Sequence, residues 1–192
     1  AVFGGGGVAG ETVLIQGGAG TVGLLAVQLA KWGGARVIAT CGDKDRGRVI
    51  AAGADVALAY DDPELPAQIL AANDGKLIDT IVEVEFGANI DTDTAVIAPN
   101  GRIAAYGSAR QMHPTLPFYP LLFKAVTIDI ILIYLLPGAQ RDAAITRLHH
   151  ALQDGALDCP VEKVFALADT ASAHEAVEAG ARNGAILIDC QR

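Results

Sequence analysis

Three glycines near the start of the chain have a spacing that binds phosphate groups in proteins. Gly18, Gly20 and Gly23 form a Gly-x-Gly-x-x-Gly pattern between an apolar run, residues 12–16, and a helical pattern, residues 21–32. The first glycine allows a tight turn, the second lets a pyrophosphate approach the backbone, and the third lets the helix pack closely on the strand. Unpaired N–H groups at the helix start favour an anion. The pattern predicts a dinucleotide-binding loop; a plain strand-to-helix turn is the alternative.

The charges after the second apolar run bear on which dinucleotide would bind. A site for NAD(H) has a carboxylate there for the ribose 2′-hydroxyl, and Asp43 is the nearest one. Lys44, Arg46 and Arg48 surround it, and the first fifty residues carry five basic and three acidic side chains on a chain with a net charge of −8. A local basic patch suits a 2′-phosphate, so we predict NADP(H) over NAD(H). A solvated helix start would show the same charges.

The elements that position these residues alternate between strand and helix. Apolar and β-branched runs predict strands, and helical spacing of apolar residues, often ended by glycine, predicts the helices between them. This alternation predicts an α/β fold, a Rossmann-type doubly wound parallel six-stranded sheet with helices on both faces. The predicted strands are residues 12–16, 36–41, 56–59, 80–84 and 102–106, with the run 126–136 as a sixth, and the helices are residues 21–32, 45–52, 63–73 and 91–97.

The last part of the chain has a different character. Helices are predicted at residues 141–154 and 170–180, and strands at residues 161–167 and 185–189 that have no place in a six-stranded Rossmann sheet. We therefore expect a flexible glycine-rich lead-in, a dinucleotide-binding domain, and a C-terminal helix-strand extension that completes a separate substrate domain. These three parts are residues 1–10, 11–155 and 156–192.

Composition excludes several classes of protein. With 52% hydrophobic residues the chain is not disordered, and its net charge of −8 argues against a dedicated nucleic-acid-binding protein. The longest apolar stretch, residues 128–136, contains Asp129 and falls far short of the roughly 20 residues of a membrane span. Three cysteines without a Cys-x-x-Cys spacing indicate neither a disulfide framework nor a zinc ribbon, and they fit a reducing cytoplasm.

No residue is assigned a catalytic role from the sequence. His149 and His150 are adjacent, so their rings point apart on a helix and no zinc site is expected. Cys41 lacks an evident histidine partner for nucleophilic chemistry. Glu83 and Glu85 are not expected to form a pair of carboxylates for acid–base catalysis. A cofactor would then carry the chemistry, with the protein supplying position and electrostatics.

A set of segments along nearly the whole chain carries a family resemblance. They are residues 9–23 with the glycine loop, 28–31, 36–40, 53–55, 100–103, 106–108, 123–128, 173–176 and 183–184. Together they resemble the zinc-independent quinone oxidoreductases (zeta-crystallin type) of the medium-chain dehydrogenase/reductase superfamily. The resemblance implies an enzyme that transfers hydride from NADPH to quinones or activated C=C (enone) bonds, without zinc.

The resemblance also implies roles for individual residues. In the glycine loop, the pyrophosphate would lie between Gly18 and Gly23, surrounded by Ala19, Gly20, Thr21 and Val22. The adenosine end would face Gly42, Lys44, Arg46 and Tyr60, and the nicotinamide end Asn89, Tyr106, Gly107, Ser108, Ile130 and Ile131.

Two features depart from the family's pattern. The GroES-like substrate domain that forms its first half is absent from the sequence, and Ala185 stands where a basic residue usually follows the C-terminal glycine. The first departure suggests a fragment, and catalysis by this chain alone is not expected.

The apolar run 126–136 suggests a partner. An exposed, flat apolar edge invites pairing, so we predict that this run pairs with its own copy across a two-fold axis in a homodimer; a strand in the sheet interior is the alternative. The predicted function is the NADPH-binding portion of a quinone or enone oxidoreductase acting on a small electrophile, with no membrane or nucleic-acid partner. A non-catalytic NADP(H)-binding module, a sensor or structural protein, is the alternative function.

Overall fold

The computed structural model describes residues 1–180 and 184–191. The chain divides into two compact units, Ala1–Ala156 and Leu157–Arg192, each described by itself. Asn183, part of the C-terminal resemblance, lies outside the described residues. In the part of the chain that the structure covers, no helix is long and apolar enough to cross a membrane.

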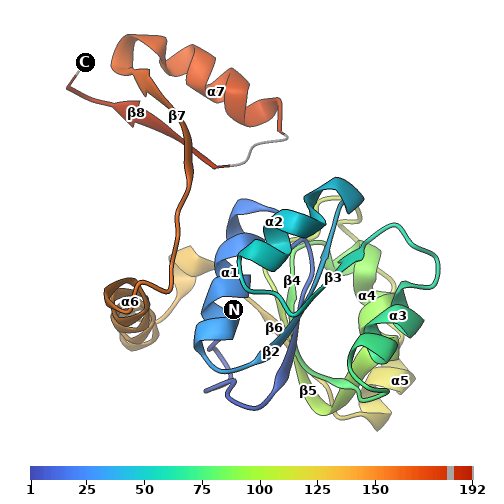
Figure 1. Cartoon of the computed structure of the whole chain (residues 1–192). Helices are drawn as coiled ribbons and strands as arrows, with labels where there is room; N and C mark the ends of the chain where they lie inside the picture. The colour runs from blue at the N-terminus through green and yellow to red at the C-terminus, as the bar shows by residue number, and fades with distance from the viewer. Residues whose placement is uncertain (181–183, 192) are drawn as a thin grey trace. The chain divides into compact units, whose positions relative to one another are not determined.

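The first unit is built on a six-stranded parallel sheet (Figure 1). Its strands follow the order β3-β2-β1-β4-β5-β6, and all neighbours run parallel. Chain order reverses beside β1, the switch point at which open α/β sheets bind ligands beyond the carboxyl ends of their strands. The predicted fold class is confirmed. The strands are β1 (Thr12–Ile15), β2 (Arg36–Cys41), β3 (Val56–Ala59), β4 (Ile78–Glu83), β5 (Ile97–Ala105) and β6 (Thr127–Ile130).

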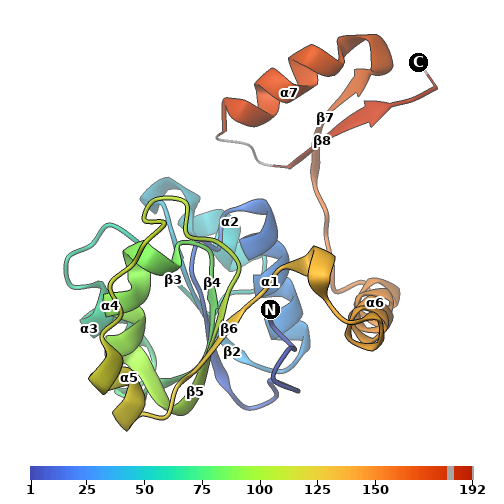
Figure 2. The ribbon, with the colours of Figure 1, turned by 180° about the vertical axis from the view of Figure 1, so that it is seen from behind.

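Helices cover both faces of this sheet (Figures 1 and 2). Helices α1 (Thr21–Trp32) and α2 (Arg46–Ala51) cover one face, and α3 (Leu65–Ala72), α4 (Phe86–Val96) and α5 (Phe118–Phe123) cover the other. Successive residues of β1 alternate between the two cores, since Val13 and Ile15 pack under α1 while Leu14 packs on the opposite side. A strand buried on both faces is continuously apolar, which is why β1 could be predicted from the sequence.

The glycine-rich N-terminal segment packs onto the domain, so the expectation of a flexible lead-in was wrong. Val2 and Val8 are only 6% and 3% exposed. The ring of Phe3 meets that of Trp32 edge-to-face, with the centroids 6.0 Å apart. Two buried valines and an aromatic contact therefore anchor the segment, although four glycines separate the anchors in the sequence.

Helix α6 (Gly138–Gln153) contacts the same region of the first unit. The guanidinium of Arg147 lies 5.0 Å from the centroid of the Phe3 ring. Asp154, just beyond the helix, accepts a hydrogen bond of 2.9 Å from the indole N–H of Trp32. These contacts join α6 to the N-terminal segment and to the end of α1.

Helix α4 differs most from the sequence-based prediction. It begins at Phe86, directly after β4, whereas a start at residue 91 was predicted. Its buried face contains Phe86, Ile90 and the fully buried Asp93. The missed residues 86–90 contain Gly87 and Asn89, which have low helix propensity, so the first part of α4 was not predicted.

The segments around β5 and β6 also differ from the predicted boundaries. Strand β5 begins at Ile97 and includes Asn100 with φ 60°, and its pairing with β4 shifts register before Arg102. Helix α5 lies in the proline-rich loop, where no helix was predicted. Strand β6 ends at Ile130, so only four residues of the apolar run 126–136 are strand.

The second unit is a small βαβ arrangement. Strands β7 (Val161–Ala166) and β8 (Ala185–Asp189) pair in parallel, and α7 (Thr170–Glu178) lies between them in the chain. Apolar side chains such as Val164 and Leu187 remain 52% and 44% exposed. Val164 and Leu187 are partners in the register of the two strands, so they lie on one face of the sheet, which stays open while α7 packs on the strands.

Truncating an anchor of the N-terminal segment tests its packing. We expect Val8→Ala to lower the free energy of unfolding by about 1–2 kcal/mol, because two buried carbons are removed from a closed core. The exposed neighbour Ala9 provides the control, and Ala9→Ser is expected to change stability by less than about 0.5 kcal/mol. Denaturant unfolding measures both; equal, small effects would mean that the segment is flexible after all.

Candidate functional site

The glycine loop joins β1 to α1 at the carboxyl edge of the sheet. Gly17 has φ 69°, and the Gly18 N–H donates to the carbonyl of Thr40 at 2.7 Å. A Cβ added to Gly23 would lie 2.1 Å from the Gly17 carbonyl oxygen, whereas one added to Gly20 would come no closer than 3.4 Å to it. Gly23 therefore permits the close approach of helix and loop, as predicted, and Gly20 leaves open space above the backbone.

The first turn of α1 presents a set of backbone donors. Its first intrahelical bond runs from Leu24 N to Gly20 O at 2.8 Å, so the N–H groups of Thr21, Val22 and Gly23 have no partner within the helix. Thr21 and Val22 are exposed, and no acidic residue lies in this turn. Free N–H groups and the positive end of the helix dipole together make a site for an anion such as a pyrophosphate.

The adenosine end of the predicted site lies after β2 and β3. Gly42 and Tyr60 are neighbours, because a Cβ added to Gly42 would lie 3.9 Å from the Tyr60 ring. Tyr60 is 56% exposed, and Lys44 is exposed. Arg46 is engaged differently: its Nε lies 2.9 Å from Asp43 Oδ1, and its Nη1 donates to the Ala57 carbonyl at 3.5 Å.

Arg48 is a site residue that sequence reasoning left unassigned. Its Nη2 donates to the Ala19 carbonyl at 2.6 Å, so it holds the glycine loop from the side of α2. Because the acceptor is a backbone oxygen 29 residues away, no residue-type pattern signals the contact. Nearby Cys41 is buried, and burial raises the pKa of its thiol, which disfavours a thiolate.

The residues predicted at the nicotinamide end follow the carboxyl ends of β4, β5 and β6. Gly107 accepts a hydrogen bond from Phe86 N at 3.0 Å, and its own Cβ would lie 2.4 Å from the Val84 carbonyl oxygen. Ser108 accepts from Gly87 N at 2.9 Å and donates its hydroxyl to the Gln111 carbonyl at 2.6 Å. The Ser108 hydroxyl thus already forms hydrogen bonds within the protein, to Gly87 and Gln111.

The remaining residues of that end differ in exposure. Ile130 is 80% exposed, and Ile131 N donates to Ala105 O at 2.8 Å. Tyr106 is partly buried, and burial together with the Glu83 charge raises the pKa of its phenol to about 12. Asn89 donates from Nδ2 to the Glu83 carboxylate at 3.0 Å.

Beneath this edge lies a buried pair of carboxyls that the sequence analysis missed. Glu83, the last residue of β4, and Asp93 of α4 are both 0% exposed, and they lie close enough for each carboxyl to affect the pKa of the other. Burial raises the pKa of both groups, and the charge of Glu83 raises that of Asp93 further. The sequence analysis considered only Glu85 as a partner for Glu83, whereas the carboxyl near Glu83 is ten positions away on the next helix.

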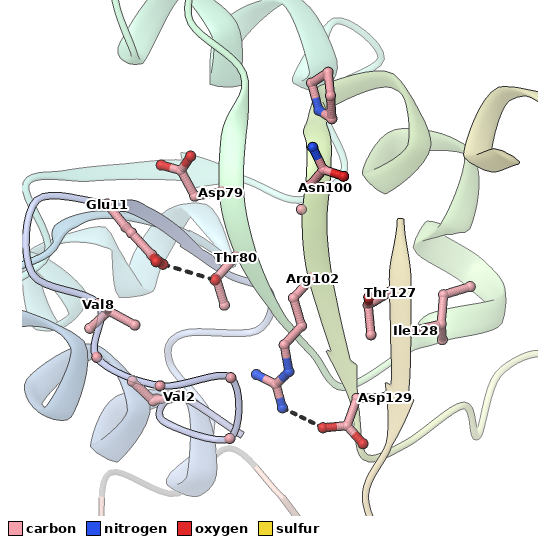
Figure 3. Close-up of a pocket in the computed structure, with 16 residues that line it drawn as sticks. Val2, Val8, Glu11, Asp79, Thr80, Asn100, Arg102, Thr127, Ile128 and Asp129 are labelled. Carbon is pink, nitrogen blue, oxygen red and sulfur yellow. Dashed lines mark hydrogen bonds and ion pairs between the residues drawn. The ribbon is translucent and has the colours of Figure 1, made fainter. Parts of the chain in front are cut away.

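A cavity of about 590 Å³ lies at the opposite end of the strands. The N-terminal segment, the first half of β4, the middle of β5 and most of β6 line it, and Figure 3 shows Arg102 reaching Asp129 and Thr80 reaching Glu11 across it. Open α/β sheets bind ligands beyond the carboxyl ends of their strands. This cavity is therefore separate from the glycine-loop site.

Replacing Gly23 tests the close approach of helix and loop. We expect Gly23→Ala to destabilise the protein by about 1–3 kcal/mol, since the Gly17 carbonyl must move to admit a methyl group. Gly47 of α2 is the matched control, because a Cβ there has no neighbour within 4 Å. Gly47→Ala should stabilise the protein by about 0.4–1 kcal/mol. Denaturant midpoints measure both; a stable Gly23→Ala variant would contradict the packing.

Comparisons with known proteins point to one family. The family described as zinc-binding dehydrogenase matches residues 21–149. A probable quinone oxidoreductase of Schizosaccharomyces pombe is 25% identical over 184 residues, covering 94% of this chain and 55% of that protein. The chain spans about half the length of the curated quinone oxidoreductases it matches, and 8% of a polyketide synthase subunit of Mycobacterium tuberculosis to which it is 28% identical.

Two solved structures have the same fold. A mycobacterial quinone oxidoreductase is 26% identical with a TM-score of 0.84, over 94% of this chain and 57% of its own. A mycobacterial protein complexed with NADPH is also 26% identical, with a TM-score of 0.79 over 94% of this chain and 58% of its own.

The zinc in the family's description has no counterpart among the side chains that the structure describes. Within residues 1–180 and 184–191, no three His, Cys, Asp or Glu side chains gather in a way that could hold a metal ion. The donor set therefore does not fit a zinc site. The chain belongs to the zinc-binding dehydrogenase family, and within the medium-chain dehydrogenase/reductase superfamily it corresponds to the C-terminal, cofactor-binding portion of the quinone oxidoreductases.

Proposed function

We propose that this chain is the NADPH-binding portion of an oxidoreductase that reduces quinones or enones. The observation that carries the proposal is the first turn of α1, where open N–H groups and a glycine-lined surface meet at the switch point of the sheet. The printed names of the relatives and the NADPH complex of a mycobacterial neighbour support it.

The chain's own residues would bind and orient the dinucleotide. The N–H groups between Ala19 and Gly23 would hold the pyrophosphate, with Arg48 keeping the Ala19 carbonyl turned away from it. Gly42 and Tyr60 would take the adenine ribose and adenine. Bound there, the dinucleotide supplies the hydride. The loop at Tyr106–Ser108, with Asn89, Ile130 and Ile131, would line the nicotinamide end.

NADP(H) is proposed over NAD(H) on the strength of one side chain. Lys44 is exposed beside Gly42, whereas Arg46 interacts with Asp43 and with the Ala57 carbonyl. Lys44 is thus the cation best able to reach a 2′-phosphate without breaking a contact. Asp43, bound to Arg46, is less free to accept a hydrogen bond from a ribose 2′-hydroxyl.

Replacing Lys44 tests this preference. We expect Lys44→Ala to raise the Kd for NADPH by about tenfold and to leave that for NADH unchanged, because only NADPH carries the phosphate. Lys76→Ala, which removes an exposed lysine just before the amino end of β4, should change neither Kd. Titration calorimetry measures all four values; equal affinity of the unchanged protein for NADPH and NADH would contradict the proposal.

The second unit supports an enzyme over a sensor. Its strands β7 and β8 lie outside the six-stranded sheet and leave apolar side chains exposed, so we propose that they complete a separate substrate domain. A sensor needs no such unit. In the full-length protein, NADPH oxidation with a panel of quinones and enones should show turnover. Tight NADPH binding without turnover would favour the sensor.

We also propose a homodimer formed through β6. This strand lies at the end of the strand order of the six-stranded sheet, which supports the dimer over the alternative of an interior strand. Ile130, Tyr134 and Leu135 in and after it are 80%, 87% and 78% exposed. An open edge next to a cluster of exposed apolar side chains favours pairing with a second copy.

Light scattering tests the dimer. We expect a two-fold higher mass than that of one chain at micromolar concentration, and Leu135→Lys should shift the protein toward the monomer because it places charge in the apolar cluster. Ile50→Lys, at an exposed position of α2, should leave the mass unchanged. A strictly monomeric unchanged protein would rule out the dimer.

A further inference from the structure

We propose that Glu83 and Asp93 share a single proton, held on Asp93, and that the protonated carboxyl positions the glycine loop through Gln16 and Thr40. These are positioning residues, since none of them is assigned a contact with the cofactor. The part of the proposal that concerns the dinucleotide rests on the proposed function. The part that concerns the proton does not.

A continuous chain of hydrogen bonds connects the loop to the carboxyl pair. The Gly17 N–H donates to Thr40 Oγ1 at 3.2 Å, and Thr40 Oγ1 donates to Gln16 Oε1 at 2.6 Å. Gln16 Nε2 in turn donates to Asp93 Oδ1 at 2.9 Å. Thr40, Gln16 and Asp93 are no more than 2% exposed, so water does not compete for these groups.

The directions in which these hydrogen bonds are donated determine which carboxyl carries the proton. Oδ1 of Asp93 already accepts from Gln16, while Oδ2 is buried and receives no N–H or O–H donor from the described residues. Its neighbour Glu83 is an acceptor, taking hydrogen bonds from the Glu85 N–H and from Asn89 Nδ2. A proton on Asp93 Oδ2, donated to Glu83, satisfies every one of these atoms.

Two ionised carboxylates would be strongly unfavourable at this position. Both groups are fully buried, and the hydrogen bonds they accept come from amide N–H groups instead of Lys or Arg. Two buried like charges in contact cannot both ionise near neutral pH. Burial raises the pKa of both carboxyls, consistent with a retained proton.

The other groups that face Glu83 and Asp93 are uncharged, so they would not stabilise a pair of ionised carboxylates. From β1 and β2 come the neutral Gln16 and Thr40, and from α4 the neutral Asn89. From the end of β5 comes Tyr106, whose pKa of about 12 keeps it neutral. Lys124 binds the carbonyls of Thr94, Ala95 and Ile97 at the end of α4 instead.

The same hydrogen bonds hold two N–H groups of the glycine loop. Thr40 accepts from Gly17 through its hydroxyl and from Gly18 through its carbonyl. Its hydroxyl can accept from Gly17 only while its own hydrogen points to Gln16, and the Gln16 amide keeps that orientation only while it donates to Asp93. Asp93, through Gln16 and Thr40, thus fixes the loop that would hold the pyrophosphate.

The pH dependence of unfolding tests the shared proton. Folded Asp93 keeps a proton that the unfolded chain has lost above about pH 4, so the unfolded state binds fewer protons and stability falls as the pH rises. From pH 6 upward, until folded Asp93 ionises, the unfolding constant of the unchanged protein should rise about tenfold per pH unit relative to Asp93→Asn. Asparagine imitates the protonated acid, with Oδ1 accepting and Nδ2 donating.

Asp91→Asn is the control for this measurement, because Asp91 lies exposed on the same helix. It should keep the pH dependence of the unchanged protein. The shared proton is ruled out if Asp93→Asn and the unchanged protein unfold with the same pH dependence, or if Asp93→Asn is much less stable at neutral pH.

A pair of variants at Thr40 tests the positioning of the loop. Thr40→Val removes the hydroxyl at nearly constant shape and should raise the Kd for NADPH about five- to tenfold; Thr40→Ser keeps the hydroxyl and should stay within about twofold. Hydrogen exchange of the Gly17 amide should quicken in the valine variant alone. Unchanged exchange in Thr40→Val overturns the positioning role. If the unchanged protein binds no NADPH, the proposed function fails, while exchange and unfolding still decide this proposal.

Discussion

The contact between the Gly17 carbonyl and Gly23 is the constraint on which the rest of the site depends. A methyl group at position 23 would lie 2.1 Å from that oxygen, so only glycine lets α1 start so close to the end of β1. The close start turns the first N–H groups of the helix toward the carboxyl edge of the sheet. Gly42, Tyr60 and Gly107 follow other strands to the same edge, because parallel strands end together.

A loop of glycines has little side-chain packing of its own, so its conformation must be held from outside. Two neighbouring residues do this by binding the backbone groups of the loop. Arg48 binds the Ala19 carbonyl from α2, and Thr40 binds the N–H groups of Gly17 and Gly18 from β2. Buried polar networks of this kind specify one geometry only when every member is satisfied, which ties the loop, through Thr40 and Gln16, to the buried carboxyl of Asp93.

The sequence is a good guide wherever burial is purely apolar. The predicted bounds of the helix at residues 21–32 and of the strands at residues 36–41 and 56–59 agree with the structure, because each buries an uninterrupted apolar face. The start of helix α4 was missed since Gly87 and Asn89, near its beginning, have low helix propensity. The N-terminal segment was misread for the opposite reason, because its glycines concealed the buried Val2 and Val8.

The charges of the site show a further limit of sequence reasoning. Lys44, Arg46 and Arg48 are equivalent when they are counted, and together they favour a phosphate-rich ligand. Their contacts separate them: Arg48 holds the glycine loop and Arg46 binds Asp43, which leaves Lys44 exposed at the edge. The number of cations therefore determines how strongly the site attracts negative charge in general. Discrimination between two dinucleotides depends instead on which cation has N–H groups that no other residue binds. That property is decided by backbone carbonyls, which have no signature in the sequence.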